Sequence, residues 1–412
     1  MPFVALEAAT ALSGVGNGIA MVAFPWLALE VTGSPTAAAA IGAITLLPLL
    51  LASLVSGTLV DMLGRRRVSV VSDVFSLVSV AAIPVLDAWV GLGFGLLAAL
   101  AVLGAVFDPA GITAREAMLP EAARAAGLRL ERVNGIHEAV WGLALLVGPG
   151  VGGLLIALVG ATEAFWVTAA CFGMSASLMV MVRVPGAGRP PVHERVDGFW
   201  SATKEGLVFL WHDRVLRSVA ALTTLLVGFW LPIQGVVLPV YFQRQQEPGH
   251  LAAVLMALSA GGLLGSLLYA AVGTRVRRRT AFVGALVVAS LAVMGMAFLP
   301  PLIGLLGFGF AAGTAYGPIG PIANVVMQER TPERLRGRVL GLLTSVGLAA
   351  GPAGYLLAGP LIDAIGLRGA FLVLAGGLVA VAVGSIGVGA LEDLDDVSAG
   401  SSEATAGEAS RG

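Results

Sequence analysis

The stretch Gly57-Thr58-Leu59-Val60-Asp61-Met62-Leu63-Gly64-Arg65-Arg66-Arg67 decides how the rest of the chain is interpreted. It packs four charges close together, and long apolar runs lie on both sides of it. An interruption of this kind predicts a short loop between two membrane-spanning helices, held at one face of the membrane by its arginines.

The composition agrees with a membrane protein. The 412-residue chain is 57% hydrophobic and only 12% charged, about half the charged fraction of an ordinary soluble domain. A helix needs about 20 apolar residues to cross a hydrocarbon core of ~30 Å, and cutting the sequence by that rule gives twelve predicted spans. Their approximate limits are 3–30, 36–60, 68–88, 91–118, 134–160, 162–183, 214–243, 250–273, 280–299, 301–328, 336–362 and 366–390.

Basic residues predict the orientation of these spans. With alternate loops assigned to opposite faces, one face receives 22 of the 24 Lys and Arg residues, and the other receives only Arg244 and Arg368. Cytoplasmic loops carry the excess of positive charge in membrane proteins. Both termini are therefore expected in the cytoplasm.

The sequence also contains an internal repeat. The three arginines at 65–67 recur at 277–279, and the pattern Gly-x-x-x-Ala-Phe at 160–165 recurs at 366–371. Such repeats are typical of transporters built from two related halves. The predicted organisation is an N-terminal six-helix bundle at 1–183, a cytoplasmic linker at 184–213 with a short helix over 198–211, a C-terminal six-helix bundle at 214–390 and a disordered acidic tail at 391–412.

The opening stretch closely resembles motif A, the loop between helices 2 and 3 of the major facilitator superfamily. The resemblance implies an all-α membrane protein with twelve transmembrane helices in two six-helix bundles related by a pseudo-two-fold axis. It implies a conformational latch made by Gly57, Asp61, Gly64 and Arg65. Asp61 precedes Arg65 by four residues, so the two can meet if the loop is helical. In the second half Gly273 stands at the position of Asp61, so the latch is expected on one side only.

A second motif lies in the fifth span, at Gly148-Pro149-Gly150-Val151-Gly152-Gly153. It resembles motif C, which in this superfamily marks exporters that work as antiporters. Glycines let a neighbouring helix approach closely, and Pro149 frees a carbonyl and bends its helix. We therefore expect Gly148, Pro149, Gly152 and Gly153 to lie where helices seal or part. The alternative is ordinary small-residue packing in a chain with 56 glycines.

Acidic residues inside spans are candidates for proton coupling, because charge is costly in hydrocarbon. Asp108, directly before Pro109, and Glu138 are the two candidates. The alternative for each is a salt bridge to Arg115 or a capping role near the cytoplasmic face. Asp73, together with several acids near span ends, is expected at the membrane interface.

Polar and aromatic residues of the first, seventh and tenth spans are candidates for a substrate cavity, because these spans occupy the same place in successive three-helix units. The alternative for each is a packing role. The candidates are Asn17, Trp26, Trp230, Gln234, Tyr316 and Asn324.

Two softer stretches, at 24–35 and 107–110, look like the bacterial branch that contains macrolide and enterobactin exporters. This resemblance implies a bacterial inner-membrane secondary transporter that exports a small amphipathic drug or siderophore-like compound by alternating access, in exchange for protons. The fourth span departs from the pattern of many proton-driven exporters, because it lacks a mid-membrane arginine of the motif B type. The nearest arginine, Arg115, is expected close to the cytoplasm.

The sequence argues against an enzyme. Its four histidines show no zinc spacing, and it has neither a Gly-x-Ser-x-Gly nor a Walker pattern, so we expect no metal, no cofactor and no use of ATP. The expected partners are a small-molecule substrate, the lipid bilayer and a proton gradient, without nucleic acid, and the chain is expected to be a monomer. Two rival hypotheses are an uptake transporter and a transport-inactive receptor or scaffold with the same fold.

Overall fold

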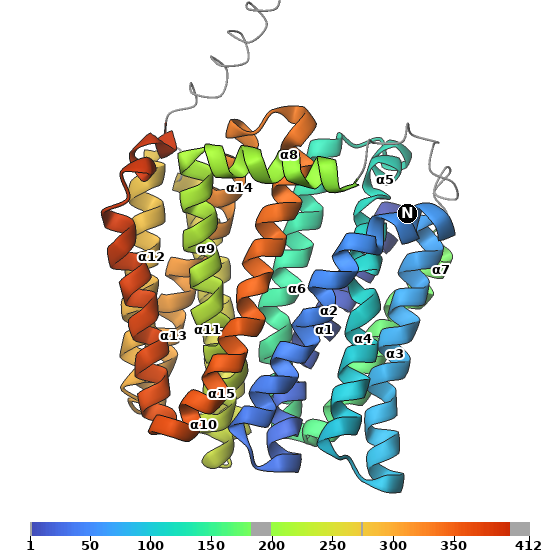
Figure 1. The fold of residues 1–412 in the computed structure, drawn as a ribbon. Coiled ribbons are helices and arrows are strands. Elements are labelled where there is room, and N and C mark those ends of the chain that lie inside the picture. The colour runs from blue at the N-terminus through green and yellow to red at the C-terminus, as the bar shows by residue number, and fades with distance from the viewer. Residues whose placement is uncertain (1, 183–198, 273–274, 396–412) are drawn as a thin grey trace, which may run out of the picture. The chain divides into compact units, whose positions relative to one another are not determined.

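The computed structural model describes residues 2–182, 199–272 and 275–395, and every regular element in those ranges is helical (Figure 1). The predicted all-α fold is therefore confirmed. In chain order the elements are α1 (Pro2–Thr32), α2 (Pro35–Leu63), α3 (Arg65–Val90), α4 (Phe94–Glu116), α5 (Leu119–Ala126), α6 (Leu130–Val159), α7 (Ala161–Met181), α8 (Phe199–His212), α9 (Arg214–Pro232), the π-helix η1 (Ile233–Val237), α10 (Leu238–Arg244), α11 (Pro248–Val272), α12 (Arg278–Ala297), α13 (Leu302–Tyr316), α14 (Ile319–Arg330), α15 (Glu333–Ile386) and the 3-10 helix η3 (Gly389–Asp395).

Length and hydropathy show that this is a membrane protein with many spans. Within the described residues, 10 helical segments are long and apolar enough to cross a bilayer. The sequence predicts two further spans, over 36–60 and 336–362, and these residues belong to α2 and to the first part of α15. The count of twelve stays a prediction.

The Gly-x-x-x-Ala-Phe repeat has the same local structure in both copies. Gly160 (φ 95°) separates α6 from α7, and Gly366 (φ 76°) bends α15. An L-residue with a Cβ rarely adopts such positive φ values, which explains glycine at both turns. Phe165 and Phe371, five residues later, are each 0% exposed. The internal repeat is therefore visible as a repeated helix junction anchored by a buried aromatic ring.

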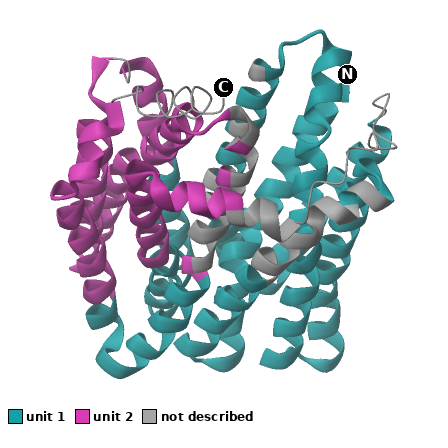
Figure 2. Ribbon diagram, turned by 45° about the horizontal axis from the view of Figure 1, so that its top comes forward, with its two compact units in different colours: residues 1–193, 231–259, 352–370 teal, residues 194–230, 260–351, 371–412 magenta. Residues whose placement is uncertain are grey.

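The chain forms two compact units, shown in Figure 2: residues 1–193, 231–259 and 352–370 make the first, and 194–230, 260–351 and 371–412 make the second. In the first unit α1 packs along α6 and α7, α3 packs along α4 and α7, and α2 packs along α4. In the second, α12 packs along α13. The division into two six-helix bundles at 1–183 and 214–390 stays a prediction.

The predicted linker and tail are partly described. Helix α8 occupies the residues for which the sequence predicted a short helix, and most of the linker before it lies outside the described residues. At the other end η3 extends into the predicted tail, where Leu391 is 0% and Leu394 is 2% exposed. Order therefore continues to Asp395, past the expected boundary at 391. Residues 396–412 lie outside the described part of the chain.

Candidate functional site

A polar stripe runs along α3, inside a span that is otherwise apolar. Ser69, Ser72, Asp73, Ser76 and Ser79 are all buried. Residues three and four apart share one face of an α-helix, so these side chains point in one direction. The stripe faces α4 and α7, the two helices that pack along α3.

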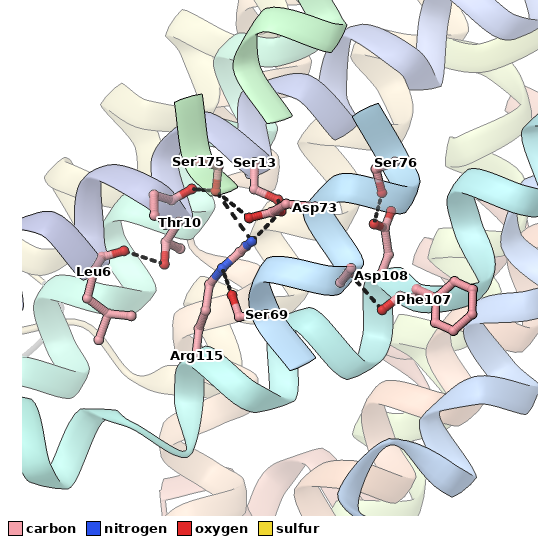
Figure 3. A network of polar contacts seen from close by, with 12 residues as sticks. Leu6, Thr10, Ser13, Ser69, Asp73, Ser76, Phe107, Asp108, Arg115 and Ser175 are labelled. Carbon is pink, nitrogen blue, oxygen red and sulfur yellow. Dashed lines mark hydrogen bonds and ion pairs between the residues drawn. The ribbon is translucent and has the colours of Figure 1, made fainter. Parts of the chain in front are cut away.

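An ion pair between Asp73 and Arg115 lies at the centre of this stripe (Figure 3). Arg115 Nη2 lies 2.5 Å from Asp73 Oδ1, and each side chain is 2% exposed. Ser13 donates a hydrogen bond to Asp73 Oδ1 at 3.2 Å, and Ser175 donates one to Oδ2 at 2.7 Å. Arg115 Nε donates to Ser69 Oγ at 3.1 Å. The pair is thus neutral, hydrogen-bonded and shared by α1, α3, α4 and α7, which is what a buried charge requires.

This pair corrects two expectations from the sequence. Asp73, expected at the membrane interface, is buried among the helices, and Arg115, suggested as a partner for Asp108 or Glu138, pairs with Asp73 and not with Asp108 among the described side chains. The reason is that α3 packs along α4 and brings its polar stripe against Arg115. The three- and four-residue spacing of the serines was the sequence signal that could have revealed this site.

Asp108 lies on α4 beside the ion pair but outside it, as Figure 3 shows. Ser76 Oγ donates to Asp108 Oδ1 at 2.8 Å, and the Asn17 side chain lies near the same carboxyl group. Among the described side chains its direct partners are therefore neutral. The structure thus brings together a predicted proton carrier and a predicted cavity residue. The side chain of Glu138, the other proton candidate, lies outside the described part of the structure.

One face of the motif C glycines meets α1. A Cβ built on Gly148 would lie 2.7 Å from the Cα of Gly18, and one built on Gly152 would lie 3.1 Å from the Cα of Ile19. Carbon atoms in ordinary contact are 3.5–4 Å apart, so only glycine fits at Gly148 without moving the backbone. We call this contact of Gly18, Ile19, Gly148 and Gly152 the glycine seam.

The other face of the same motif meets α11. A Cβ on Gly150 would lie 2.6 Å from Met256 Cγ, and one on Gly153 would lie 2.8 Å from the Cα of Ala252. A Cβ built on Gly142, on the same helix, would have no described atom within 4 Å. The motif therefore holds α6 against two helices at once, and this close approach is local to it.

A second close contact joins α2, η1 and α15. The Tyr355 side chain is 2% exposed and fits against two glycines, Gly42 of α2 and Gly235 of η1. About two helical turns from Gly42 on α2 and from Tyr355 on α15, Thr36 Oγ1 donates a hydrogen bond to Asp363 Oδ2 at 2.5 Å. Single-turn π-helices occur often at functional sites, and η1 includes the cavity candidate Gln234.

The predicted latch is only partly described. Gly64, with φ 88°, lies between the end of α2 and the start of α3. The next residue, Arg65, has its Nη1 2.8 Å from Oε1 of Glu121 on α5. Glu121 is a partner that the sequence did not suggest. Arg66 Nε donates to the carbonyl of Met179 at 3.1 Å, so this arginine also ties α3 to the end of α7. The side chain of Asp61 and the surroundings of Gly57 lie outside the described residues, and the Asp61–Arg65 contact stays a prediction.

The cavity candidates divide between the two units. Trp26 is 3% exposed, and its Nε1 donates to Glu30 at 2.6 Å, which fits the packing alternative. In the second unit the rings of Trp230 and Tyr316 stack with centroids 4.8 Å apart, and Asn324 is exposed. Asn17, Trp26 and Gln234 belong to the first unit, and Trp230, Tyr316 and Asn324 to the second. A common cavity for all six stays a prediction.

Comparisons with known proteins agree with this architecture. The family described as Major Facilitator Superfamily matches residues 6–355 and 236–410. The chain is 46% identical over 394 residues to the multidrug efflux pump Tap of Mycobacterium tuberculosis (strain ATCC 25618 / H37Rv), covering 94% of this chain and 93% of that protein. It is 45% identical over 397 residues to the pump of the same name from Mycolicibacterium fortuitum, covering 96% and 97%.

Two solved transporters have a similar fold at low sequence identity. The D-xylose-proton symporter matches with a TM-score of 0.74 and 12% identity, over 94% of this chain and 97% of that one. The nucleoside transporter NupG matches with a TM-score of 0.73 and 11% identity, over 94% and 98%. At these identities the likeness concerns the fold alone.

Proposed function

Because the chain belongs to the major facilitator superfamily, we propose that it is a secondary transporter that exports small amphipathic compounds by alternating access, with protons moving in the opposite direction. The observation that carries the proposal is 46% identity, over 94% of the chain, to a multidrug efflux pump. The match covers 93% and 97% of two efflux pumps, and transporters of this superfamily are generally not enzymatic.

The close helix contacts support alternating access. The contacts of α6 with α11 and of α2 with α15 lie near the helix ends that are remote from the arginine-rich loops. Gly153 is close to the end of α6, and Thr36 is close to the start of α2. Small residues let helices approach closely without a permanent side-chain interlock. In our proposal these contacts close one end of the transporter and separate when that end opens.

Asp108 supports proton exchange. Its carboxyl group accepts a hydrogen bond from the neutral Ser76, and no ion pair of Asp108 is found among the described side chains, so a change of its charge breaks no ion pair there. Asp73, in contrast, is held by Arg115. Asp108 is therefore our first candidate for the coupling residue, and Glu138 remains the second. Asn17, a candidate cavity residue, lies near Asp108, which supports a proton site close to the substrate.

The proposed localisation rests on the family and on the distribution of basic residues among the loops. The chain is a multi-pass membrane protein, and we place it in a bacterial inner membrane as a monomer with both termini and the 184–213 linker in the cytoplasm. Cysteine labelling tests the orientation. A Pro190→Cys variant in a Cys171→Ser background should resist an impermeant thiol reagent added to intact cells and react in everted vesicles.

Counterflow in proteoliposomes tests the transport proposal directly. Purified protein is reconstituted in liposomes loaded with unlabelled ethidium, and the entry of a labelled trace is measured with no pH gradient. The proposal expects a transient accumulation, because a carrier that alternates exchanges labelled for unlabelled substrate. Gly148→Leu liposomes serve as the inactive control. Binding of the label without counterflow would favour the receptor or scaffold, and accumulation in cells rather than exclusion would favour an uptake transporter.

A further inference from the structure

Helices α1 and α6 run side by side with a constant register. Glu7 contacts His137, 130 positions along the chain, and the same separation relates Gly14 to Ala144 and Gly18 to Gly148. Contacts that keep one separation over eleven residues belong to parallel helices that stay in step. The glycine seam and the Glu7–His137 contact are therefore two ends of one helix–helix interface.

The Glu7–His137 contact is buried, and it gives a hydrogen-bond partner to only one of the two Glu7 carboxylate oxygens. Oε1 of Glu7 lies 3.1 Å from His137 Nδ1, and the two side chains are 8% and 6% exposed. Oε2 of Glu7 is also buried and has no hydrogen-bond partner in the described structure. A buried carboxylate oxygen without a donor is destabilising unless something, such as a proton or water, satisfies it.

The number of protons on this pair determines its net charge. With one proton shared between the carboxyl and imidazole groups, the pair is neutral. When that proton leaves, a single negative charge remains, and burial disfavours a single charge strongly. The pair can therefore take up one proton with a large change in local electrostatics.

Other charged groups near this end of α1 have partners of their own. Asp73 and Arg115 pair with each other and reach α1 through Ser13. On α5, Glu121 contacts Arg65 and Arg124. Arg66 of α3 bonds to main-chain carbonyls of α7, Arg132 of α6 is exposed, and the side chains of Glu131 and Glu138 lie outside the described structure. Among the described side chains, His137 is thus the direct polar partner of the Glu7 carboxyl group.

From this geometry we infer that Glu7 and His137 form a second proton-binding site of the transporter, at the opposite end of the interface that holds the glycine seam. Loss of the proton disturbs the packing of α1 on α6 and thereby the Gly18–Gly148 contact. In this proposal the site acts through the packing of α1 on α6 and not on the substrate itself, so both residues are positioning residues. The inference rests on the proposed transport function for its consequence, but not for the binding of the proton itself.

Ethidium exchange tests the consequence. The exchange is measured in proteoliposomes at equal pH on both sides, so that no proton gradient contributes, and the pH is raised in steps from acid to alkaline. In the wild type, exchange falls as the pair loses its proton. In Glu7→Gln, which cannot leave a negative charge in the interface, the fall at alkaline pH is smaller than in the wild type, and only the dependence due to Asp108 remains. His137→Asn removes the imidazole that contacts Glu7 and should also change the profile.

The chain offers a matched control in another Glu–His pair. Glu247 and His250 lie 3.7 Å apart, but their side chains are 51% and 41% exposed. Water stabilises either charge state there, so Glu247→Gln and His250→Asn should keep the wild-type profile. Identical profiles for the wild type, Glu7→Gln and His137→Asn would overturn the proposal.

Infrared spectroscopy tests proton binding without transport. Purified protein is titrated, and the carbonyl stretching band of protonated carboxylic acids is recorded. We expect a component that disappears with rising pH in the wild type, is missing from Glu7→Gln, is altered in His137→Asn and is unchanged in Glu247→Gln. The same bands in all four proteins would overturn the site. Because this measurement needs no substrate, wild-type protein that shows the Glu7 component but no ethidium exchange would contradict the proposed transport function and leave the proton site supported.

Discussion

Helix α1 is held in two different ways. Toward α3, α4 and α7 it contributes Ser13 to the polar network, the hydrogen-bonded set around Asp73 and Arg115. Toward α6 it contributes Gly18 to the glycine seam, where the backbones nearly touch. Both arrangements suit an apolar surrounding, in which hydrophobic burial does not drive helices together. We therefore expect the polar network to be destabilised when a side-chain group is removed, and the glycine seam to be destabilised when a side-chain atom is added.

The largest effect should come from removing one charge of the network. Arg115→Met leaves the Asp73 carboxylate buried without its cation, and breaking a buried pair in this way costs about 3–5 kcal/mol. Thermal unfolding of the detergent-purified protein should show a strongly lowered midpoint. Arg124→Met is the control, because that side chain is 76% exposed.

A double variant sharpens the same test. Asp73→Asn with Arg115→Met removes both charges, so it should recover much of the stability lost by Arg115→Met alone. If the double variant is as unstable as the sum of the two single variants, the two residues act independently and the network has been misidentified.

Adding atoms to the glycine seam should have the next largest effect. A Cβ on Gly148 would lie 2.7 Å from the Gly18 Cα, and overpacking of this kind costs about 1–3 kcal/mol. Gly148→Ala should therefore be destabilised and slow in transport, and Gly148→Leu should be inactive. Gly142→Ala, where there is open space on the same helix, should be neutral or slightly stabilised. Equal behaviour of the two alanine variants would show that the seam does not need glycine.

Asp108 lies next to the network without being part of its ion pair, so its neutralisation should affect coupling more than stability. Asp108→Asn keeps an oxygen acceptor for Ser76 and should change the free energy of unfolding by about 1 kcal/mol or less. Exchange of ethidium for ethidium should persist, and accumulation driven by a pH gradient should disappear. Uphill, pH-driven transport by both Asp108→Asn and Glu138→Gln would place the proton elsewhere.

The smallest effect on stability is expected at the latch. Arg65 and Glu121 are 17% and 14% exposed, and ion pairs with access to water typically contribute about 0.2–1 kcal/mol. A double-mutant cycle with Arg65→Gln and Glu121→Gln should return a coupling energy in that range. A coupling energy near zero would show that this contact does not contribute to the latch.

Features encoded in neighbouring residues could be predicted from the sequence. The arginine-rich loop, the helix turn at Gly160 with its copy at Gly366, and the all-α fold all follow from local patterns. The pairing of Asp73 with Arg115 could not, because it depends on the register of α3 against α4. Sequence periodicity shows which side of a helix is polar, but not which residue of another helix lies opposite.

The same limit explains the contacts of α6. The glycines of motif C indicate a close approach, but the sequence does not reveal that Gly148 and Gly153 contact different helices. Glu7 and His137 lie 130 positions apart in the sequence, and only the packing of α1 on α6 brings them together. Sequence patterns therefore indicate single residues of interest but do not identify their partners on other helices.

Proton movement driven by substrate tests the central claim most directly. Ethidium is added outside wild-type proteoliposomes that contain a trapped pH-sensitive dye, with no initial pH gradient. Our account predicts that ethidium entry drives protons out, so that the lumen becomes alkaline, and that Asp108→Asn liposomes preloaded with unlabelled ethidium take up labelled ethidium by exchange without this change. Ethidium entry through the wild type with a lumen that stays constant or becomes acidic would contradict proton antiport, and absence of protein-dependent ethidium movement would contradict an ethidium transporter altogether.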